Sequence, residues 1–242
     1  MLAISQLWIY PVKSLGGMRV PRARVDERGF EGDRRFMVVD ESGAFLTQRK
    51  VPRMACVRAT IEDGALRLEH AGMRALSVRL DVDGPAREVR VWRDRVLAVD
   101  AGDEAAAWIG EAIGVRARLV RMPESTRRPA DPEHARPGDL VAFADAFPFL
   151  LVSEGSLEAL SRELGAPADV RRFRPNLVVR GAPPFAEDGW RELAAGSVRF
   201  FVRKPCARCR IVDVDPDRGV LGGDVLAALA RSRTVGNAVL FG

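Results

Sequence analysis

The stretch RFMVVDESGAFLT, residues 35–47, carries the pattern that decides the fold. Its first half is a run of β-forming apolar residues, residues 41–43 (ESG) form a turn signal, and apolar residues resume at 44–46. Two such runs joined by a glycine-containing turn predict a β-hairpin. We therefore expect this part of the chain to fold as antiparallel β-structure.

Similar signals surround this hairpin throughout the first hundred residues. Residues 2–12 alternate apolar and polar side chains, residues 57–68 predict a second hairpin, and residues 89–99 alternate again. Short strands separated by turns favour a barrel or a sandwich over βαβ units. The first part of the chain is therefore predicted to be a β-barrel-like domain.

Helices are few. Residues 103–113 place apolar side chains at helical spacing, Ser153 is a suitable N-cap for a second helix, and residues 224–230 form a weaker third segment. Residues 123–138 are rich in proline, arginine and acids, which is typical of a linker or a long surface loop. The sequence thus predicts a mostly β protein with a few helices (α+β) in two domains, residues 1–122 and 123–242.

Length and composition describe an ordinary globular protein. The chain has 242 residues, of which 47% are hydrophobic and 29% charged, so it can bury a core without disulfides. No apolar run approaches the roughly 18–20 residues that cross a bilayer. Residues 1–6 lack the pattern of a signal peptide. We therefore expect a cytoplasmic protein with no membrane segment.

The positive charge is carried almost entirely by arginine. The net charge is +5, and of the 38 basic residues three are lysines, which leaves 35 arginines. Arginine suits planar recognition of phosphate or carboxylate, but no cationic block is long or pure enough to form a basic tail. We therefore expect an anionic small-molecule ligand rather than nucleic acid.

Two of the three cysteines form a C-x-x-C motif, Cys206 and Cys209. The remaining cysteine and the two histidines have no paired spacing, which argues against a zinc site. The motif lies between the apolar run 198–202 and residues 210–214, which we also expect to be a strand. Two interpretations stay open here: small half-buried residues in a β-loop, or a thiolate, favoured by neighbouring cations, that acts as nucleophile or soft-metal ligand.

Two further segments could bind an anion. Residues 10–17 (YPVKSLGG) bring Lys13, Ser14 and two glycines into a loop after a strand. In residues 171–176 (RRFRPN), Arg172 and Arg174 would share one face of a strand, like two prongs of a phosphate clamp. The alternatives are a solvated turn for the first segment and surface arginines for the second.

These segments together resemble a known family. Residues 7–14 resemble the opening of the β-barrel domain that precedes a MOSC domain, and residues 173–176, 186–190 and 206–219 resemble the MOSC domain itself. Their order and spacing are similar to those of the mitochondrial amidoxime-reducing components and their bacterial relatives. The resemblance extends from residue 2 to the C-terminus.

The resemblance implies a molybdenum cofactor, in which a pterin dithiolene and one protein cysteine hold the metal. The family pattern assigns the metal and the catalytic role to the second cysteine of the motif, Cys209. The residues that would line the phosphate and pterin of molybdopterin are Lys13, Ser14, Arg35, Thr47, Arg174 and Asn176. Gln48 and Arg49 would follow Thr47 on a strand near the same pocket.

The implied activity is that of an oxidoreductase in N-reductive metabolism. Molybdenum would cycle between states VI and IV, losing or gaining an oxygen ligand, while small N-hydroxylated substrates such as amidoximes or hydroxylamino bases are reduced. Three cysteines cannot hold an iron–sulfur cluster as well, so we expect a separate donor protein of the ferredoxin, flavoprotein or cytochrome type. The alternative is a sulfur carrier or sulfurtransferase that uses a cysteine persulfide.

The two ends of the chain also carry expectations from the family. The sequence starts directly at the barrel, so we expect no membrane anchor. It ends at Gly242, where relatives continue into final strands, so we expect the last strands of the second domain to be missing.

Overall fold

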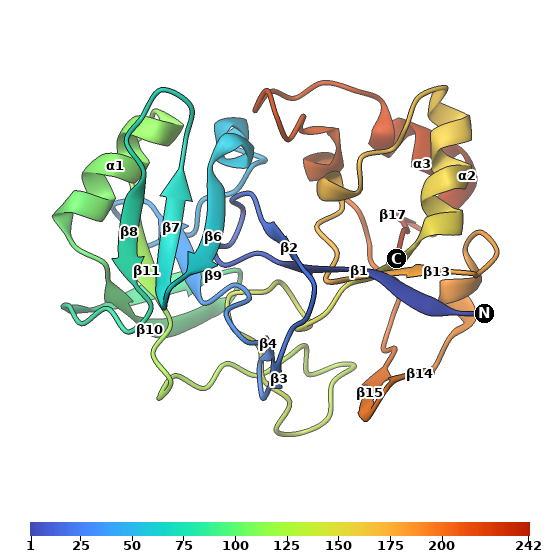
Figure 1. The fold of residues 1–242 in the computed structure, drawn as a ribbon, viewed down its shortest axis with the longest axis horizontal. Helices are drawn as coiled ribbons and strands as arrows, with labels where there is room; N and C mark the ends of the chain where they lie inside the picture. The colour runs from blue at the N-terminus through green and yellow to red at the C-terminus, as the bar shows by residue number, and fades with distance from the viewer.

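The computed structural model describes residues 1–242, and the chain folds into two lobes joined by a shared sheet (Figure 1). The fold is mostly β with three α-helices, as the sequence predicts. The first ten strands are β1 (Ala3–Ile9), β2 (Met18–Val20), β3 (Val25–Asp26), β4 (Gly29–Phe30), β5 (Phe36–Val39), β6 (Arg58–Glu62), β7 (Ala65–Glu69), β8 (Leu76–Arg79), β9 (Ala86–Val91) and β10 (Asp94–Asp100). The others are β11 (Arg118–Arg121), β12 (Leu151–Ser153), β13 (Leu177–Arg180), β14 (Glu192–Ala195), β15 (Val198–Phe201), β16 (Thr234–Val235) and β17 (Ala238–Val239). The helices are α1 (Asp103–Ile113), α2 (Glu154–Leu164) and α3 (Val225–Arg233), with short 3₁₀ segments η1 (Pro52–Cys56), η2 (Val170–Arg172), η3 (Ala186–Gly189) and η4 (Arg210–Asp213).

The N-terminal lobe is built from two antiparallel sheets and one helix. The sheet β5-β11-β10-β9 and the sheet β6-β7-β8 face a core that α1 covers at one side (Figure 1). Alternating side-chain directions account for the burial pattern of β7, in which Leu66 and Leu68 are fully buried and Arg67 between them is not. The sheet β5-β11-β10-β9 buries apolar residues on both faces, since Val38 belongs to one cluster and its neighbour Met37 to another.

A third sheet connects the two lobes. Its order is β12-β13-β1-β2, with β1 antiparallel to β13 in a register that places Leu7 opposite Leu177. The first strand of the chain is thus part of the sheet of the C-terminal lobe. In return, Ala142 and Phe143 pack with Met37 in the core of the N-terminal lobe. Ile9 also packs with Leu177 in a small buried cluster, so the lobes are interlocked by residues on either side of residue 122.

The C-terminal lobe packs α2 and α3 against the shared sheet. Phe173, Leu229 and Phe241 belong to its buried cluster, and the rings of Phe173 and Phe241 are 4.4 Å apart. The cysteine motif pairs with the end of the chain, since the Cys206 amide donates to the Gly242 carbonyl at 2.6 Å. This pairing fixes the backbone of the motif from one side.

The three predicted helices are confirmed, and their ends have physical causes. α1 spans residues 103–113 as expected and ends at Gly114, whose φ of 76° only glycine adopts without strain. Ser153 caps α2, because its hydroxyl accepts a hydrogen bond from the amide of Ser156. α3 continues to Arg233, three residues beyond the predicted end. None of these helices is both long and apolar enough to pass through a membrane.

Two predicted strands in the C-terminal lobe are wrong. Residues 210–214 form η4 instead of a strand. Arg171 and Arg172 form the end of η2, and Arg174 follows it with a φ of 56°, so Arg172 and Arg174 do not share a strand face. The hairpin predicted over residues 35–47 is present in part: β5 continues into a turn, Val39 pairs antiparallel with Phe45, and the Leu46 amide donates to the Val38 carbonyl at 2.9 Å, but residues 44–45 form isolated bridges instead of a strand.

Candidate functional site

Five segments from both lobes converge where the lobes meet. They are the loop 10–17, the turn 47–50, the tip of the β9–β10 hairpin, the segment 142–145 and the cysteine motif 206–209. The hydrogen bonds and ring contacts described below join each segment to the next. The site is therefore assembled by long-range contacts and not by any single motif.

Cys209 is the only residue of its motif that contacts the N-terminal lobe through its thiol. It is a free cysteine and the N-cap of η4. Nη1 of Arg49 donates to Sγ of Cys209 at 3.6 Å, and the same guanidinium lies 4.8 Å from the ring centre of Trp92. Residues 47–50 form a turn, not the expected strand, because the amide of Lys50 donates back to the carbonyl of Thr47.

Lys13 and Asp145 form the second part of the site. Nζ of Lys13, which is buried, donates to the Phe143 carbonyl at 2.8 Å and pairs with the Asp145 carboxylate. Trp92 Nε1 donates to the same carboxylate at 2.9 Å. Burial lowers the pKa of Lys13. Although desolvation opposes it, the Lys13 ammonium holds the pKa of Asp145 well below its usual range, so the pair is ionised.

Tyr10 forms the centre of a buried cationic stack. The guanidinium groups of Arg174 and Arg34 lie 4.3 Å and 4.9 Å from its ring centre. Burial raises the pKa of Tyr10, so its phenol is neutral. Burial, followed by repulsion from Arg34, lowers the pKa of Arg174 to about 10, which still leaves it charged at neutral pH. Arg34 has a carboxylate partner in Asp33.

Arg174 has no such partner. Its Nη1 donates to the Leu15 carbonyl, but its Nη2 is buried without any hydrogen-bond partner, as are Tyr10 Oη and Arg208 Nη2. Leaving a charged donor buried and unpaired is costly. An anion that accepts from Arg174 would relieve this cost, so the residues present fit a phosphate-bearing ligand beside a soft thiolate.

The structure brings most of the predicted site residues together, but not Arg35. Ser14 is buried, and its carbonyl accepts from Gln48 Nε2 at 2.8 Å. Thr47 is buried beside them. Asn176 accepts from Arg34 Nη1 at 3.1 Å and so touches the stack. Arg35 instead pairs with Asp26 and makes no contact with the Tyr10 ring, and its Nη1 is buried without a hydrogen-bond partner.

Arg34, Trp92 and Asp145 are the site residues that the sequence did not indicate. Arg34 has a φ of 50°, which breaks the strand alternation and turns its side chain, rather than that of Arg35, towards Tyr10. Trp92 and Asp145 lie in a turn and an irregular segment, where no periodicity signals a side chain's direction.

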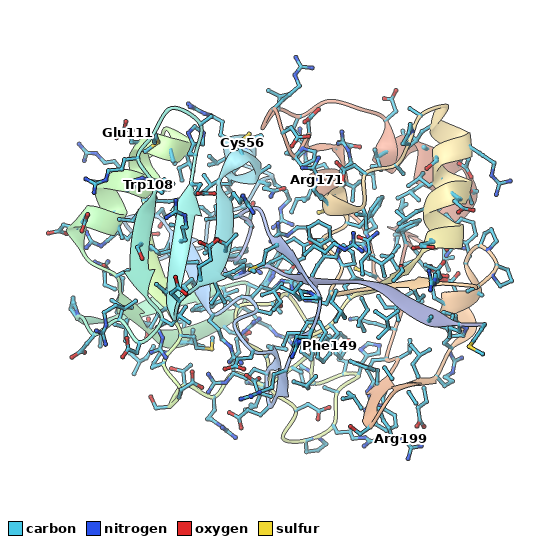
Figure 2. All side chains as sticks on the ribbon, viewed as in Figure 1. Cys56, Trp108, Glu111, Phe149, Arg171 and Arg199 are labelled. Carbon is cyan, nitrogen blue, oxygen red and sulfur yellow. The ribbon has the colours of Figure 1, made fainter.

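A further contact between the two lobes involves Cys56. Cys56 Sγ donates to the carbonyl of Asp217 at 3.3 Å, and Arg171 holds the carboxylate of Asp217 at 2.7 Å. Figure 2 labels Cys56 in the N-terminal lobe and Arg171 in the C-terminal lobe. Cys56 is thus engaged in the lobe interface and is not brought to the Cys209 cluster by any contact.

Comparisons with known proteins define the class. Residues 1–116 match the MOSC N-terminal beta barrel domain, and residues 139–242 match the MOSC domain. The mitochondrial amidoxime-reducing component 1 of Mus musculus is 35% identical over 90% of this chain and 67% of its own length. The human protein of the same name is 34% identical over 90% of this chain and 68% of its own length. The molybdenum cofactor sulfurase of Anopheles gambiae is 34% identical over 98% of this chain, but over only 33% of its own length.

The chain therefore carries the paired MOSC N-terminal and MOSC domains. Within this class, it belongs to the family of the mitochondrial amidoxime-reducing components.

Proposed function

We propose that this protein binds the molybdenum cofactor in the cytoplasm and reduces N-hydroxylated compounds. The observation that carries the proposal is the Arg49–Cys209 contact, together with Arg174, whose Nη2 is buried without a partner. A soft sulfur ligand and a free cationic donor are what a metal dithiolene with a phosphate requires. The names of the relatives, amidoxime-reducing component and molybdenum cofactor sulfurase, point to the same chemistry.

The roles of the residues follow from their contacts. Cys209 would bind the metal through its thiolate, and Arg49 would orient that sulfur. Lys13, Ser14, Thr47, Arg174 and Asn176 would hold the phosphate and pterin, with Arg34 in the place that the sequence assigned to Arg35. When bound, the cofactor supplies a metal that exchanges two electrons and an oxygen atom with the substrate.

Reduction of an amidoxime to an amidine consumes two electrons and two protons and releases water. The chain has three cysteines, all free, and no second redox centre among its residues. The electrons would therefore come from a separate ferredoxin, flavoprotein or cytochrome. The net charge of +5 favours an acidic donor, because complementary charge speeds association.

Metal analysis tests the proposal directly. Wild-type protein and the variants Cys209→Ser and Cys206→Ser are purified from cells that make the cofactor, and molybdenum is measured per chain. We expect stoichiometric molybdenum in the wild type and in Cys206→Ser, and none in Cys209→Ser. Amidoxime reduction is then followed with a chemically reduced viologen as donor.

The same preparations distinguish the oxidoreductase from a sulfur carrier. Intact-protein mass spectrometry would detect an added sulfur atom on a cysteine. A persulfide on Cys206 or Cys209 in molybdenum-free wild-type protein would overturn the oxidoreductase proposal and favour sulfur transfer.

A further inference from the structure

Trp92 occupies a turn position that does not suit its side chain. β9 and β10 pair as far as Val91 and Asp94, which leaves Trp92 and Arg93 as a two-residue turn. The φ of Trp92 is 56°, a value that hairpins normally assign to glycine or asparagine because bulky side chains are strained there. Residues held in such conformations concentrate at functional sites.

The indole of Trp92 is directed at the site and is left partly open to solvent. Its side chain is 44% exposed, its Nε1 donates to Asp145 at 2.9 Å, and Arg49 lies 4.8 Å from its ring centre. Arg49 in turn donates to the Cys209 thiol at 3.6 Å. A single side chain therefore separates this exposed ring from the sulfur.

Phe45 extends the aromatic surface. Its ring lies 5.1 Å from that of Trp92, tilted by 54°, and Lys13 Nζ lies 5.4 Å from the ring centre of Phe45. We call Trp92 and Phe45 the aromatic platform. Indole rings stack with flat π systems, and an arginine guanidinium already stacked on an aromatic ring presents a second flat face of the same kind.

We propose that Trp92 is a specificity-determining residue that selects substrates in which the N-hydroxylated group, such as an amidoxime, is carried by a flat aromatic ring. The inference rests on the proposed function, because it assumes reduction at Cys209. A saturated ring of similar size has the same apolar area but no π face, so only the flat ring gains from stacking. Aromatic stacking of this kind corresponds to about 2- to 10-fold in affinity.

The test compares two amidoximes of matched size, benzamidoxime and cyclohexanecarboxamidoxime. In the molybdenum-loaded wild type we expect a higher kcat/KM for benzamidoxime. Trp92→Asn, in which asparagine tolerates the positive φ, should lower the benzamidoxime to cyclohexanecarboxamidoxime ratio by about 3- to 10-fold, mainly through KM. Trp92→Phe should restore most of the ratio.

A matched control comes from a tryptophan outside the site. Trp108 lies on α1 at the outer side of the N-terminal lobe (Figure 2), where its Nε1 donates to the Arg74 carbonyl at 2.7 Å. Trp108→Phe should leave the substrate ratio unchanged. An unchanged ratio in Trp92→Asn would overturn the inference and reduce Trp92 to a structural support for Arg49.

Binding gives a second readout that does not depend on turnover. Saturation-transfer NMR measures how much magnetisation the ring protons of each amidoxime receive from the protein. The wild type should favour benzamidoxime, and Trp92→Asn should lose that preference. If the wild type reduces neither compound, the proposed function fails, whereas equal binding of the two compounds by the wild type contradicts the aromatic platform itself.

Discussion

The guanidinium of Arg49 and the thiol of Cys209 meet across the boundary between the two lobes, with Nη1 3.6 Å from Sγ. Arg49 comes from a turn of the N-terminal lobe, whereas Cys209 precedes η4 in the C-terminal lobe. The candidate metal ligand is thus oriented by a residue that is 160 positions away in sequence. Both matched domains are needed to form this contact.

Replacing Arg49 by methionine should weaken metal retention. The substitution keeps an apolar stem against Trp92 but removes the donor to Cys209 Sγ, and loss of such an outer partner typically costs 10–100-fold in metal affinity, so we expect roughly that loss. The measurement is molybdenum content after graded dialysis. Arg93→Met, on an exposed arginine of the neighbouring hairpin turn, is the matched control. Equal retention by Arg49→Met and wild type would contradict the orienting role.

Arg174→Met should separate stability from ligand binding. In cofactor-free protein the change removes a buried charge with an unpartnered Nη2, so the free energy of unfolding should rise by about 1 kcal/mol. Methionine and arginine bear equal strain at the φ of 56°. In protein from cofactor-making cells the same change should lower molybdenum content.

Arg172 provides the contrast for this experiment. Its Nη1 donates to the carbonyls of Val212 and Val214 at 3.2 Å and 2.8 Å. Arg172→Met should therefore lower the free energy of unfolding by about 1–2 kcal/mol. Urea denaturation of both cofactor-free variants checks the opposite signs, and a loss of stability in Arg174→Met as large as that in Arg172→Met would refute the idea of a pre-built anion site.

The sequence was sufficient for elements with local causes. The ends of α1 and the Ser153 cap of α2 depend on glycine and hydroxyl chemistry within a few residues, and both were predicted. The hairpin of β6 and β7 follows from alternation around a turn at residues 63–64. Lys13 and Arg174 were singled out because each places a cation in a glycine-containing loop or beside apolar residues, whereas Cys209 was chosen over Cys206 by the family resemblance alone.

The remaining site residues depend on contacts that no local pattern encodes. Alternation predicts which way a side chain points only while the backbone stays extended, and Arg34 and Arg174 both have positive φ angles. Asp145 reaches Lys13 across 132 positions. The shared sheet is equally non-local, because β1 pairs with β13, which follows it by about 170 residues in the sequence.

Asp100 should make the N-terminal lobe sensitive to acid. The buried carboxylate accepts from Arg118 and Arg87 and from the amide of Gly102. Although burial opposes it, these partners hold the pKa of Asp100 below its usual range. The stabilisation is therefore complete above the unfolded-state pKa of about 3.9 and is lost as the pH falls through the lower folded-state pKa.

Asp100→Asn should accordingly lower the free energy of unfolding by about 3 kcal/mol at pH 7, and the difference from the wild type should shrink below about pH 4. Urea denaturation at a series of pH values measures both effects. Asp81→Asn, at an exposed carboxylate paired with Arg79, serves as the control. It should change neither the free energy of unfolding at pH 7 nor its dependence on pH. If the difference in the free energy of unfolding between Asp100→Asn and the wild type stayed constant down to pH 2–3, the partners of Asp100 would not be lowering its pKa.

Ser153 has two structural roles, so removing its hydroxyl should lower the free energy of unfolding more than removing an ordinary helix cap does. Its hydroxyl accepts from the Ser156 amide at 3.1 Å and donates to the Glu187 carboxylate at 2.9 Å, and Glu187 is itself buried. Ser153→Ala should lower the free energy of unfolding by about 2 kcal/mol, since it removes the cap and one donor to a buried charge. Ser232→Ala, on an exposed hydroxyl that contacts Glu163, should stay within about 0.5 kcal/mol of wild type. Equal stability of the two variants in urea denaturation would mean that the Glu187 carboxylate does not depend on Ser153, and that α2 is held by its apolar face alone.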